Sequence, residues 1–432
     1  MLLRRSRIAA GVLALWVGSA LAWAQPPTPN PTENSSYYLD NGDGFANGLE
    51  LGPQFRVQAD YVYFTRENRA KEIPVITGPD TFSQRDTKFD FNSGYRLSAS
   101  FMNDDYEFEG SFFQLKSLGG SQSGSFANPL VFDGLDGFNA APPAQPTVGV
   151  SPNFLSQSTL FSPINTAANF ISATEDETLE LEYFDPGTTY TMHYNSDLQD
   201  FDFNLKGRQQ AGQLIRFGFG YRNIQLRENG SAALRGTFNT VDVDNDEVTT
   251  NEANDGLSHG TLTGAGLSGG LGGFLEGTAP TPTVLLFTNS TRTSNQLNGI
   301  QATADFSFLE TDYFILGGFA KAGVFHNDAR GSVTETFQDL QNSASRYRRS
   351  FSDTKDRASF AGNLGLTGTV IVHESVRLFA AYEVMYLSGV ALAPDQTGGI
   401  RTDINDATSL DLRTNGSALF HGGRIGIEIL FP

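Results

Sequence analysis

FDFNSGYRLSASFMNDDYEFEGSFFQL, residues 89–115, decides the fold because it reads as two strands joined by a tight turn. From Phe89 to Met102 the odd positions are apolar apart from Ser93, and most even positions are polar or glycine. Such alternation places one face of a strand in an apolar phase and the other face in a polar phase. Turn-forming residues follow at 103–105, and the alternation resumes at 106–115. The stretch therefore predicts a pair of antiparallel strands.

The same alternation recurs along the chain, and the gaps between the alternating segments are long and short in turn. The short gaps are 103–105, 207–213, 309–312 and 373–374, and the long gaps include 116–189 and 228–295. Outer-membrane barrels have an even number of antiparallel strands, tight periplasmic turns and long external loops. The predicted fold class is all-β: an antiparallel up-and-down transmembrane β-barrel of about 10–12 strands. The alternating segments are Phe55–Thr65, Phe89–Met102, Tyr106–Leu115, Tyr190–Lys206, Leu214–Arg227, Gln296–Phe308, Tyr313–Asn327, Ala358–Val372, Ser375–Leu387 and Ala418–Phe431.

The N-terminus has the organisation of a secretory signal peptide. Arg4, Arg5 and Arg7 precede the apolar run Ile8–Leu21, and Ala22–Ala24 has the small-x-small pattern of a cleavage site. The alternative, a membrane-spanning helix, needs about 20 apolar residues, and this run is shorter. We therefore expect export across the inner membrane and a mature chain that begins at Gln25.

The domain organisation follows from the signal peptide and the strands. We expect residues 1–24 to be a signal peptide and residues 25–54 to be a flexible periplasmic segment. Residues 55–432 then form one outer-membrane barrel with long loops at 116–189 and 228–295. A secreted β-sandwich would also alternate, but its strands are typically shorter, about 5–6 residues. The expected location is the bacterial outer membrane.

The composition excludes several classes of function. The chain has no cysteine, which rules out disulfides, thiol catalysis and cysteine metal sites. Its 39% hydrophobic content and mean hydropathy of −0.26 are too polar for a helical membrane protein. Without the three signal arginines, 26 Lys and Arg face 48 Asp and Glu, a net charge of −22 against −19 for the whole chain. This charge argues against a nucleic-acid partner.

The last strand, Ala418–Phe431, ends in an aromatic residue followed by Pro432. An alternating final strand with a terminal aromatic resembles the signal read by the outer-membrane insertion machinery. We therefore expect that machinery and the lipids of the outer membrane to be partners. The oligomeric state is open.

The polar face of each strand is expected to point into the barrel. A ten-stranded barrel is only slightly wider than the eight-stranded kind that side chains fill, so these residues either pair with one another or line a narrow passage. Lys321 is assigned inward because a Lys facing lipid at mid-depth costs about 2–4 kcal/mol. The predicted pore-lining residues are Arg56, Asp60, Asp90, Arg96, Glu107, Glu109, Asp202, Lys206, Arg216, Arg222, Asp305, Lys321, Arg377, Glu383, Arg424 and Glu428.

No pattern in the sequence predicts catalysis, a cofactor or a metal site, and we do not expect an enzyme. The five histidines, at 193, 259, 326, 373 and 421, lack metal-ligand spacing. The acidic stretch Val241–Asp255 begins like a calcium loop, but Glu247 stands where the turn needs Gly. It therefore reads as a solvated loop tip.

Several short motifs resemble the beta barrel porin-7 family of outer-membrane proteins. They are Gly220–Ile224 with Arg227-Glu228, Asn298–Gln301, Lys321–Val324 with Asn327, Tyr382–Gln396 (YEVMYLSGVALAPDQ), and Phe420–Gly422. The resemblance covers mainly the C-terminal half of the chain. It implies an outer-membrane barrel with a pore, and it supplies neither a substrate nor binding residues.

We expect the protein to act as a narrow or gated porin-like passive channel for small solutes or ions. The alternative is a structural or adhesive outer-membrane barrel whose lumen is plugged by side chains and whose surface loops carry the function. The first long loop contains many phenylalanines, and we expect part of it either to pack on the barrel mouth or to add a hairpin that raises the strand count to twelve.

Overall fold

The computed structural model describes residues 54–71, 74–76, 82–103, 105–127, 130–132, 155–156, 180–184, 186–207, 214–242, 283–340, 346–402 and 408–431. Clustering of the chain gives two compact units, Met1–Leu49 and Glu50–Pro432, and every described residue belongs to the second. The predicted signal peptide, the predicted N-terminal segment up to residue 53 and most of the acidic stretch 241–255 lie outside the described residues.

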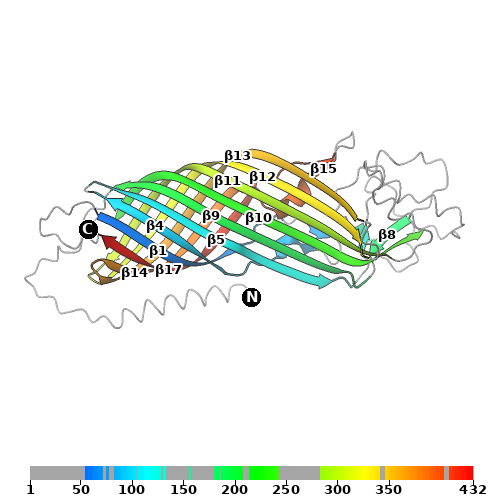
Figure 1. The fold of residues 1–432 in the computed structure, drawn as a ribbon, viewed down its shortest axis with the longest axis horizontal. Coiled ribbons are helices and arrows are strands. Elements are labelled where there is room, and N and C mark those ends of the chain that lie inside the picture. The colour runs from blue at the N-terminus through cyan, green and yellow to red at the C-terminus, as the bar shows by residue number, and fades with distance from the viewer. Residues whose placement is uncertain are drawn as a thin grey trace, which may run out of the picture. The chain divides into compact units, whose positions relative to one another are not determined.

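Ten antiparallel strands close into a barrel (Figure 1). In hydrogen-bonding order the strands run β11, β12, β13, β14, β17, β1, β4, β5, β9 and β10, and β10 pairs back to β11. This closure confirms the predicted fold class. The barrel strands are β1 (Gln54–Glu67), β4 (Asn92–Met102), β5 (Tyr106–Ser125), β9 (Thr189–Gly207), β10 (Ile215–Asp242), β11 (Thr283–Glu310), β12 (Phe314–Asp339), β13 (Arg346–His373), β14 (Val376–Val390) and β17 (Gly416–Phe431).

The connections differ between the two ends of the barrel. At one end, called the turn end, β4–β5, β9–β10, β11–β12 and β13–β14 are joined by the short connections that the sequence predicts. The opposite end, called the loop end, carries the remaining connections, which include β2 (Pro74–Ile76), β3 (Phe82–Ser83), η2 (Gln84–Asp86), η6 (Pro394–Gly399), β15 (Ile400–Thr402) and β16 (Thr408–Leu410). No helix in the described ranges is long and apolar enough to span a bilayer.

Short strands also extend the sheet beyond the loop end of β10. β8 (Glu180–Phe184) pairs with residues 238–242 of β10, β6 (Leu130–Phe132) pairs with β8, and β7 (Leu155–Ser156) pairs with β6. These three strands lie in the first predicted long loop but do not enter the closed ring. The barrel therefore has ten strands, at the lower end of the predicted range.

The outward face carries an apolar belt next to the turn end. On β10, Ile215, Phe217, Phe219 and Tyr221 are exposed and point outward, whereas the outward positions from Asn223 onward are polar apart from Ala233. Aromatic rings stand at both edges of the belt, as in transmembrane barrels. Its members include Phe55, Val57, Tyr61, Tyr63, Tyr95, Leu97, Phe101, Phe108, Phe201, Phe203, Ile300, Val324, Phe360, Leu364, Leu366, Leu378, Tyr382, Ile425, Ile427 and Phe431, all exposed.

Six strands continue far beyond the belt. β10, β11 and β13 each have 28 residues, whereas about 9–11 residues cross a bilayer. At the usual rise and tilt, a strand of this length spans about 70 Å along the barrel axis, against about 25 Å for an apolar band. The predicted loop 228–295 therefore begins and ends as strand, and the predicted loop 116–189 begins as strand. The sequence did not reveal these extensions because their outward face meets water and lacks the apolar row of a lipid-facing strand. The apolar residues there, such as Leu234 and Phe287, point inward.

The wall of the barrel has two heights. β5, β9, β10, β11, β12 and β13 form a tall wall, because β5 beyond Leu115 pairs only with β9, and β13 before Phe360 pairs only with β12. β14, β17, β1 and β4 form a low wall. The predicted strand Phe89–Met102 belongs to this low wall and begins at Asn92 in the structure.

The belt can be tested by placing a charge on it. We expect Leu364→Arg on β13 to lower the free energy of unfolding by about 2–4 kcal/mol, because this outward side chain lies within the belt and is 64% exposed. Ser352→Arg, on the outward face of the same strand beyond the belt, is the control and should change it by about 0.5 kcal/mol or less. Urea unfolding of the protein in lipid vesicles measures both. Equal losses for the two variants would contradict the position of the belt.

Candidate functional site

Side chains that point into the barrel at the level of the belt form a charged layer. It contains eight cations and eight anions, and each takes part in at least one ion pair. These positions alternate with the belt residues along each strand, which places them inside. The cations are Arg56, Arg96, Lys206, Arg216, Arg222, Lys321, Arg377 and Arg424, and the anions are Asp60, Glu107, Glu109, Asp200, Asp202, Asp305, Glu383 and Glu428.

The half of the charged layer nearer the turn end is a chain of shared carboxylates. Glu107 is 1% exposed and binds both Arg56 and Arg216. The Nζ atom of Lys206 lies 2.9 Å from Glu109 and 3.0 Å from Asp305. Because each charge has partners of opposite sign on other strands, this half of the layer is neutralised internally.

The other half of the charged layer crosses the barrel from wall to wall. Arg96 binds Glu383 through two hydrogen bonds of 3.0 and 3.1 Å, and Arg222 binds Asp200 through two of 2.8 and 2.5 Å. Asn363 links the two pairs, because its Oδ1 accepts from Arg222 at 2.9 Å and its Nδ2 donates to Glu383 at 2.7 Å. These bidentate contacts fix the side chains in one arrangement.

Fifteen of the sixteen predicted pore-lining residues lie in this layer. Asp90 does not, because it precedes β4 and is exposed, with its backbone N–H donating to the carbonyl of Gly119. Asp200 belongs to the charged layer but was not among the predicted residues. It lies on the same inward face of β9 as Asp202 and Lys206, so the alternation of that strand could have identified it. Lys321 is placed inward, 2.8 Å from Asp202.

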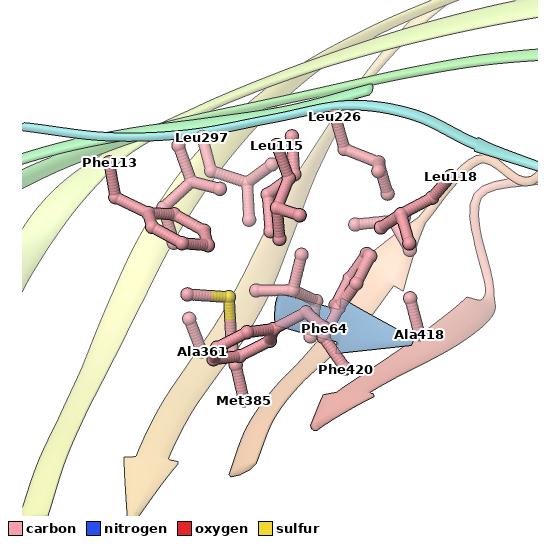
Figure 2. Close-up of a cluster of buried hydrophobic side chains, with 14 of the residues drawn as sticks. Phe64, Phe113, Leu115, Leu118, Leu226, Leu297, Ala361, Met385, Ala418 and Phe420 are labelled. Carbon is pink, nitrogen blue, oxygen red and sulfur yellow. The ribbon is translucent and has the colours of Figure 1, made fainter. Parts of the chain in front are cut away.

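Toward the loop end, the interior changes from charged to apolar. Figure 2 shows side chains from different strands that point toward one another across this level, among them Phe64, Phe113, Leu226, Met385 and Phe420. Nine of the ten barrel strands contribute to this apolar layer, whose members are at most 4% exposed. The layer comprises Val62, Phe64, Phe113, Leu115, Leu118, Leu198, Ile224, Leu226, Leu297, Phe325, Ala361, Met385, Leu387, Val390, Leu392, Ala418 and Phe420.

A buried ion pair, Arg66–Glu228, adjoins the apolar layer. Both side chains have no solvent exposure. The guanidinium of Arg66 lies over the rings of Phe89, Tyr194 and Phe420 at 5.1, 5.2 and 5.5 Å from their centroids. Arg66 also donates to the hydroxyl of Tyr194 at 2.9 Å, and that hydroxyl donates to Glu228 at 2.8 Å. The pair is thus surrounded by groups that compensate its loss of water.

A segment of the β14–β17 connection fills the barrel mouth next to this pair. This segment, Ala391–Thr397, is buried throughout, and we call it the plug. Asn295 of β11 binds both the N–H and the carbonyl of Ala391, at 2.7 and 2.8 Å. The N–H of Ala393 donates to Glu228 at 2.8 Å. Strand side chains thus satisfy the plug's backbone as another strand otherwise would.

Gly389 directs the chain into the barrel at the end of β14. Its φ of +76° is in the left-handed region, and a Cβ there would lie 2.8 Å from the hydroxyl of Ser359. Its carbonyl accepts from Asn327 at 3.1 Å and from Ser359 at 2.7 Å. A residue with a side chain would strain this turn, so the inward path of the plug depends on glycine.

The plug is also tied to the low wall. Asp395 has no solvent exposure, and its Oδ1 accepts from the backbone N–H of Lys71 at 2.8 Å. Burial raises the pKa of the Asp395 carboxyl, and the nearby negative charge of Glu228 raises it further, while the Lys71 N–H opposes both. Gln396 binds the carbonyl and the N–H of Arg413, both at 2.9 Å.

Residues that carry the family resemblance meet at the plug, although they are far apart in sequence. Glu228 and Asn327 come from two of the short motifs, and the plug occupies the end of Tyr382–Gln396. Sequence reasoning identified these motifs but assigned them no structural role. No pattern in the sequence indicates that the connection after β14 turns into the barrel.

The described histidines do not belong to a metal-binding group. His326 lies on the outer surface, 3.7 Å from Asp356, and His421 lies 2.9 Å from the hydroxyl of Tyr382. Within the ranges that the structure covers, no three His, Asp or Glu side chains are placed to hold a metal ion.

The closed ring of ten strands, the outward apolar belt and the charged layer inside it define a transmembrane β-barrel. No protein-family model matches the chain, and no curated protein matches it. The family resemblance therefore stays a prediction.

Among solved structures, the outer membrane protease OmpT from Escherichia coli is similar, at 12% identity and a TM-score of 0.36 over 89% of this chain and 98% of that one. The toluene transporter TodX from P. putida has 10% identity and a TM-score of 0.27 over 88% and 89% of the two chains. A FadL homologue from Pseudomonas aeruginosa has 10% identity and a TM-score of 0.22 over 91% and 92%. Likeness at this level carries no argument about the activity of the present chain.

Removing one member of the buried pair should destabilise the barrel strongly. We expect Arg66→Leu to lower the free energy of unfolding by about 3–5 kcal/mol, because Glu228 would remain buried without its cation. The double variant Arg66→Leu with Glu228→Leu should recover part of this loss. Urea unfolding of the three proteins in vesicles measures the coupling, and strictly additive losses would contradict it.

The docking of the plug should weaken as the pH rises. The docked state raises the pKa of Asp395 above its ordinary value of about 3.9, so it binds the proton more tightly than the undocked state. Docking is therefore strongest below that ordinary pKa and weakens as the pH passes through the raised one. Hydrogen exchange of the plug amides, corrected for the intrinsic rate, measures this, and Asp395→Asn should abolish the dependence. Protection that increases with pH would contradict it.

Proposed function

We propose that this protein is a bacterial outer-membrane barrel with a closed lumen, and that its function is structural or adhesive and lies at the loop end. The proposal includes export through a cleaved signal peptide and insertion into the outer membrane by the assembly machinery. It involves no catalysis and no nucleic acid. The observation that carries the proposal is the filling of the barrel interior at three successive levels: the charged layer, the apolar layer and the plug.

The apolar layer is the strongest support for a closed lumen. A passive channel needs a continuous path of water, and these side chains meet across the barrel with at most 4% exposure. Fully burying one such side chain is worth about 1.5–3 kcal/mol. Hydrating five of them therefore costs on the order of 10 kcal/mol. Thermal opening of such a path would occur in about one molecule in ten million.

Movement of the plug alone would leave this layer in place. Only Leu392 of the layer belongs to the plug, and the other members belong to barrel strands. The rings of Phe64 and Phe113, 5.7 Å apart between centroids, come from β1 and β5. If the plug moved out of the barrel, the apolar layer would therefore still block the path of water.

The tall wall supports a role at the loop end. Its six strands carry the connections well beyond the belt, and the outward side chains there are mostly small and polar or charged. A transmembrane pore does not require this length, since about 9–11 residues span the bilayer. The extension places the loop-end termini of these six strands well beyond the belt.

A narrow or gated porin-like channel is the alternative, and the charged layer is the observation that favours it. The paired charges at belt level would provide polar surroundings for an ion if the apolar layer and the plug moved aside. In that case Arg96 and Arg222 would contribute to ion selectivity, and neutralising either would change it.

The two functions differ in single-channel current. We expect no conductance steps from the protein purified from an outer-membrane fraction and inserted in a planar bilayer. We also expect none when a Gly-Asn-Gly turn joins Val390 directly to Gly416 and so deletes the plug. These two residues are cross-strand partners, so a tight turn can connect them. Every member of the apolar layer except Leu392 remains in this variant, and the layer should still exclude water.

Gramicidin added to the same bilayers shows that small currents are detectable. Discrete steps from the plug-deleted protein alone would replace the closed barrel with a gated channel. Discrete steps from the unmodified protein, with a selectivity that Arg96→Gln changes, would establish the open channel instead.

A further inference from the structure

A gap in the outward aromatic row lies on the low wall, at the edge of the belt nearer the loop end. Gly423 of β17 pairs across one side with Tyr63 of β1 and across the other side with Tyr382 of β14. Both tyrosines point outward and are 49% and 41% exposed. Neighbouring strands are about 4.8 Å apart, so the two tyrosine backbones are separated by roughly 10 Å with only a glycine between them.

The space above Gly423 is open. A Cβ built there would meet only the carbonyl oxygen of Ala381, at 3.8 Å. The flanking rings are held by other partners, because Tyr63 stacks on Phe91 at 5.1 Å between centroids and Tyr382 binds His421 through its hydroxyl at 2.9 Å. We call this arrangement the aromatic slot: Gly423 is its floor, Tyr63 and Tyr382 are its sides, and Phe91 and His421 border it toward the loop end.

A charged pair lies just beyond the slot, on the side away from the belt. Glu67, the last residue of β1, pairs across the sheet with Leu419 of β17, one outward position beyond His421. Arg69 donates to Glu67 at 3.0 Å, and its guanidinium lies 5.8 Å from the ring centroid of Tyr386. The two side chains are 52% and 40% exposed, so both can bind a further group.

We propose that the aromatic slot binds one phospholipid with a zwitterionic phosphoethanolamine headgroup. One acyl chain lies over Gly423 between the two tyrosines, the phosphate binds Arg69, and the ammonium group binds Glu67. The inference rests on the proposed membrane location, and it adds a ligand and a site to it.

The surroundings of the slot select this occupant. Within the belt, the neighbour of an outward gap is a lipid chain, because the adjacent surface is apolar. The charges at its outer edge have opposite signs and lie side by side, which matches a headgroup that carries both signs. An anionic headgroup would meet Arg69 favourably but Glu67 unfavourably, so it should bind more weakly.

Two matched features elsewhere on the barrel provide controls. Gly110 of β5 is another belt glycine with open space, since a Cβ there would meet only the ring of Phe203 at 3.9 Å, but Ala99 rather than a ring stands on its other side. Asp328 and Arg330 form an exposed pair on β12, 2.9 Å apart, that lies beyond the belt on the tall wall. Neither control feature combines an open floor, aromatic sides and a charge pair.

Native mass spectrometry of the detergent-purified full chain tests the proposal. Phosphatidylethanolamine or phosphatidylglycerol is added, and the bound lipids are counted. We expect one phosphatidylethanolamine per barrel, with an affinity about tenfold above that for phosphatidylglycerol. Gly423→Leu should lower the affinity for phosphatidylethanolamine about tenfold, and Gly110→Leu should not. Heat-modifiable mobility on gels checks that each variant is folded.

Neutralising the charges separates headgroup binding from chain binding. Glu67→Gln with Arg69→Gln should remove the preference for phosphatidylethanolamine over phosphatidylglycerol, whereas Asp328→Asn with Arg330→Gln should preserve it. Equal lipid binding by the wild type and Gly423→Leu would overturn the slot, and equal binding of the two lipids by the wild type would overturn the headgroup assignment. A chain absent from the outer-membrane fraction would instead overturn the membrane location on which the inference rests.

Discussion

The pairing of β10 with β11 closes the ring, and the rest of the structure depends on that closure. A chain in a bilayer must satisfy every backbone N–H and C=O within the protein, and a closed ring of antiparallel strands does so without leaving an edge. With ten strands the enclosed space is narrow. The inward side chains of the charged layer and the apolar layer therefore meet partners from other strands, and these two levels are packed as a core although the exterior faces lipid.

This packing explains why charged and apolar residues occupy separate levels inside. At belt level, a charged side chain such as Arg222 can be inward only if it finds its counterion there, as it does in Asp200. Beyond the belt the outside is aqueous, so the apolar half of each strand can turn inward, as Phe64 and Leu226 do. Apolar side chains thus point outward where the outside is lipid and inward where the outside is water.

The sequence predicted the parts of the structure in which apolar residues that face lipid alternate with polar residues that face the interior. The alternation around Phe217 and Leu97 gave the strand positions, the turn end and almost all of the charged layer. It missed the extensions of β5, β10 and β11, because small polar residues face water there on one side. It also missed the Arg66–Glu228 pair and its contact with Ala393, which join residues about 160 positions apart. No local pattern encodes such a contact.

The unequal heights of the tall and low walls make the barrel's rim oblique. A cylinder with a level rim presents the same profile from every direction in the plane of the membrane, whereas this barrel has a tall side and a low side. A molecule that approaches along the membrane surface meets the polar strands of the tall wall from one direction and the short strands of the low wall from the opposite direction. Each copy therefore has a direction in the plane of the membrane, which runs from its tall wall to its low wall.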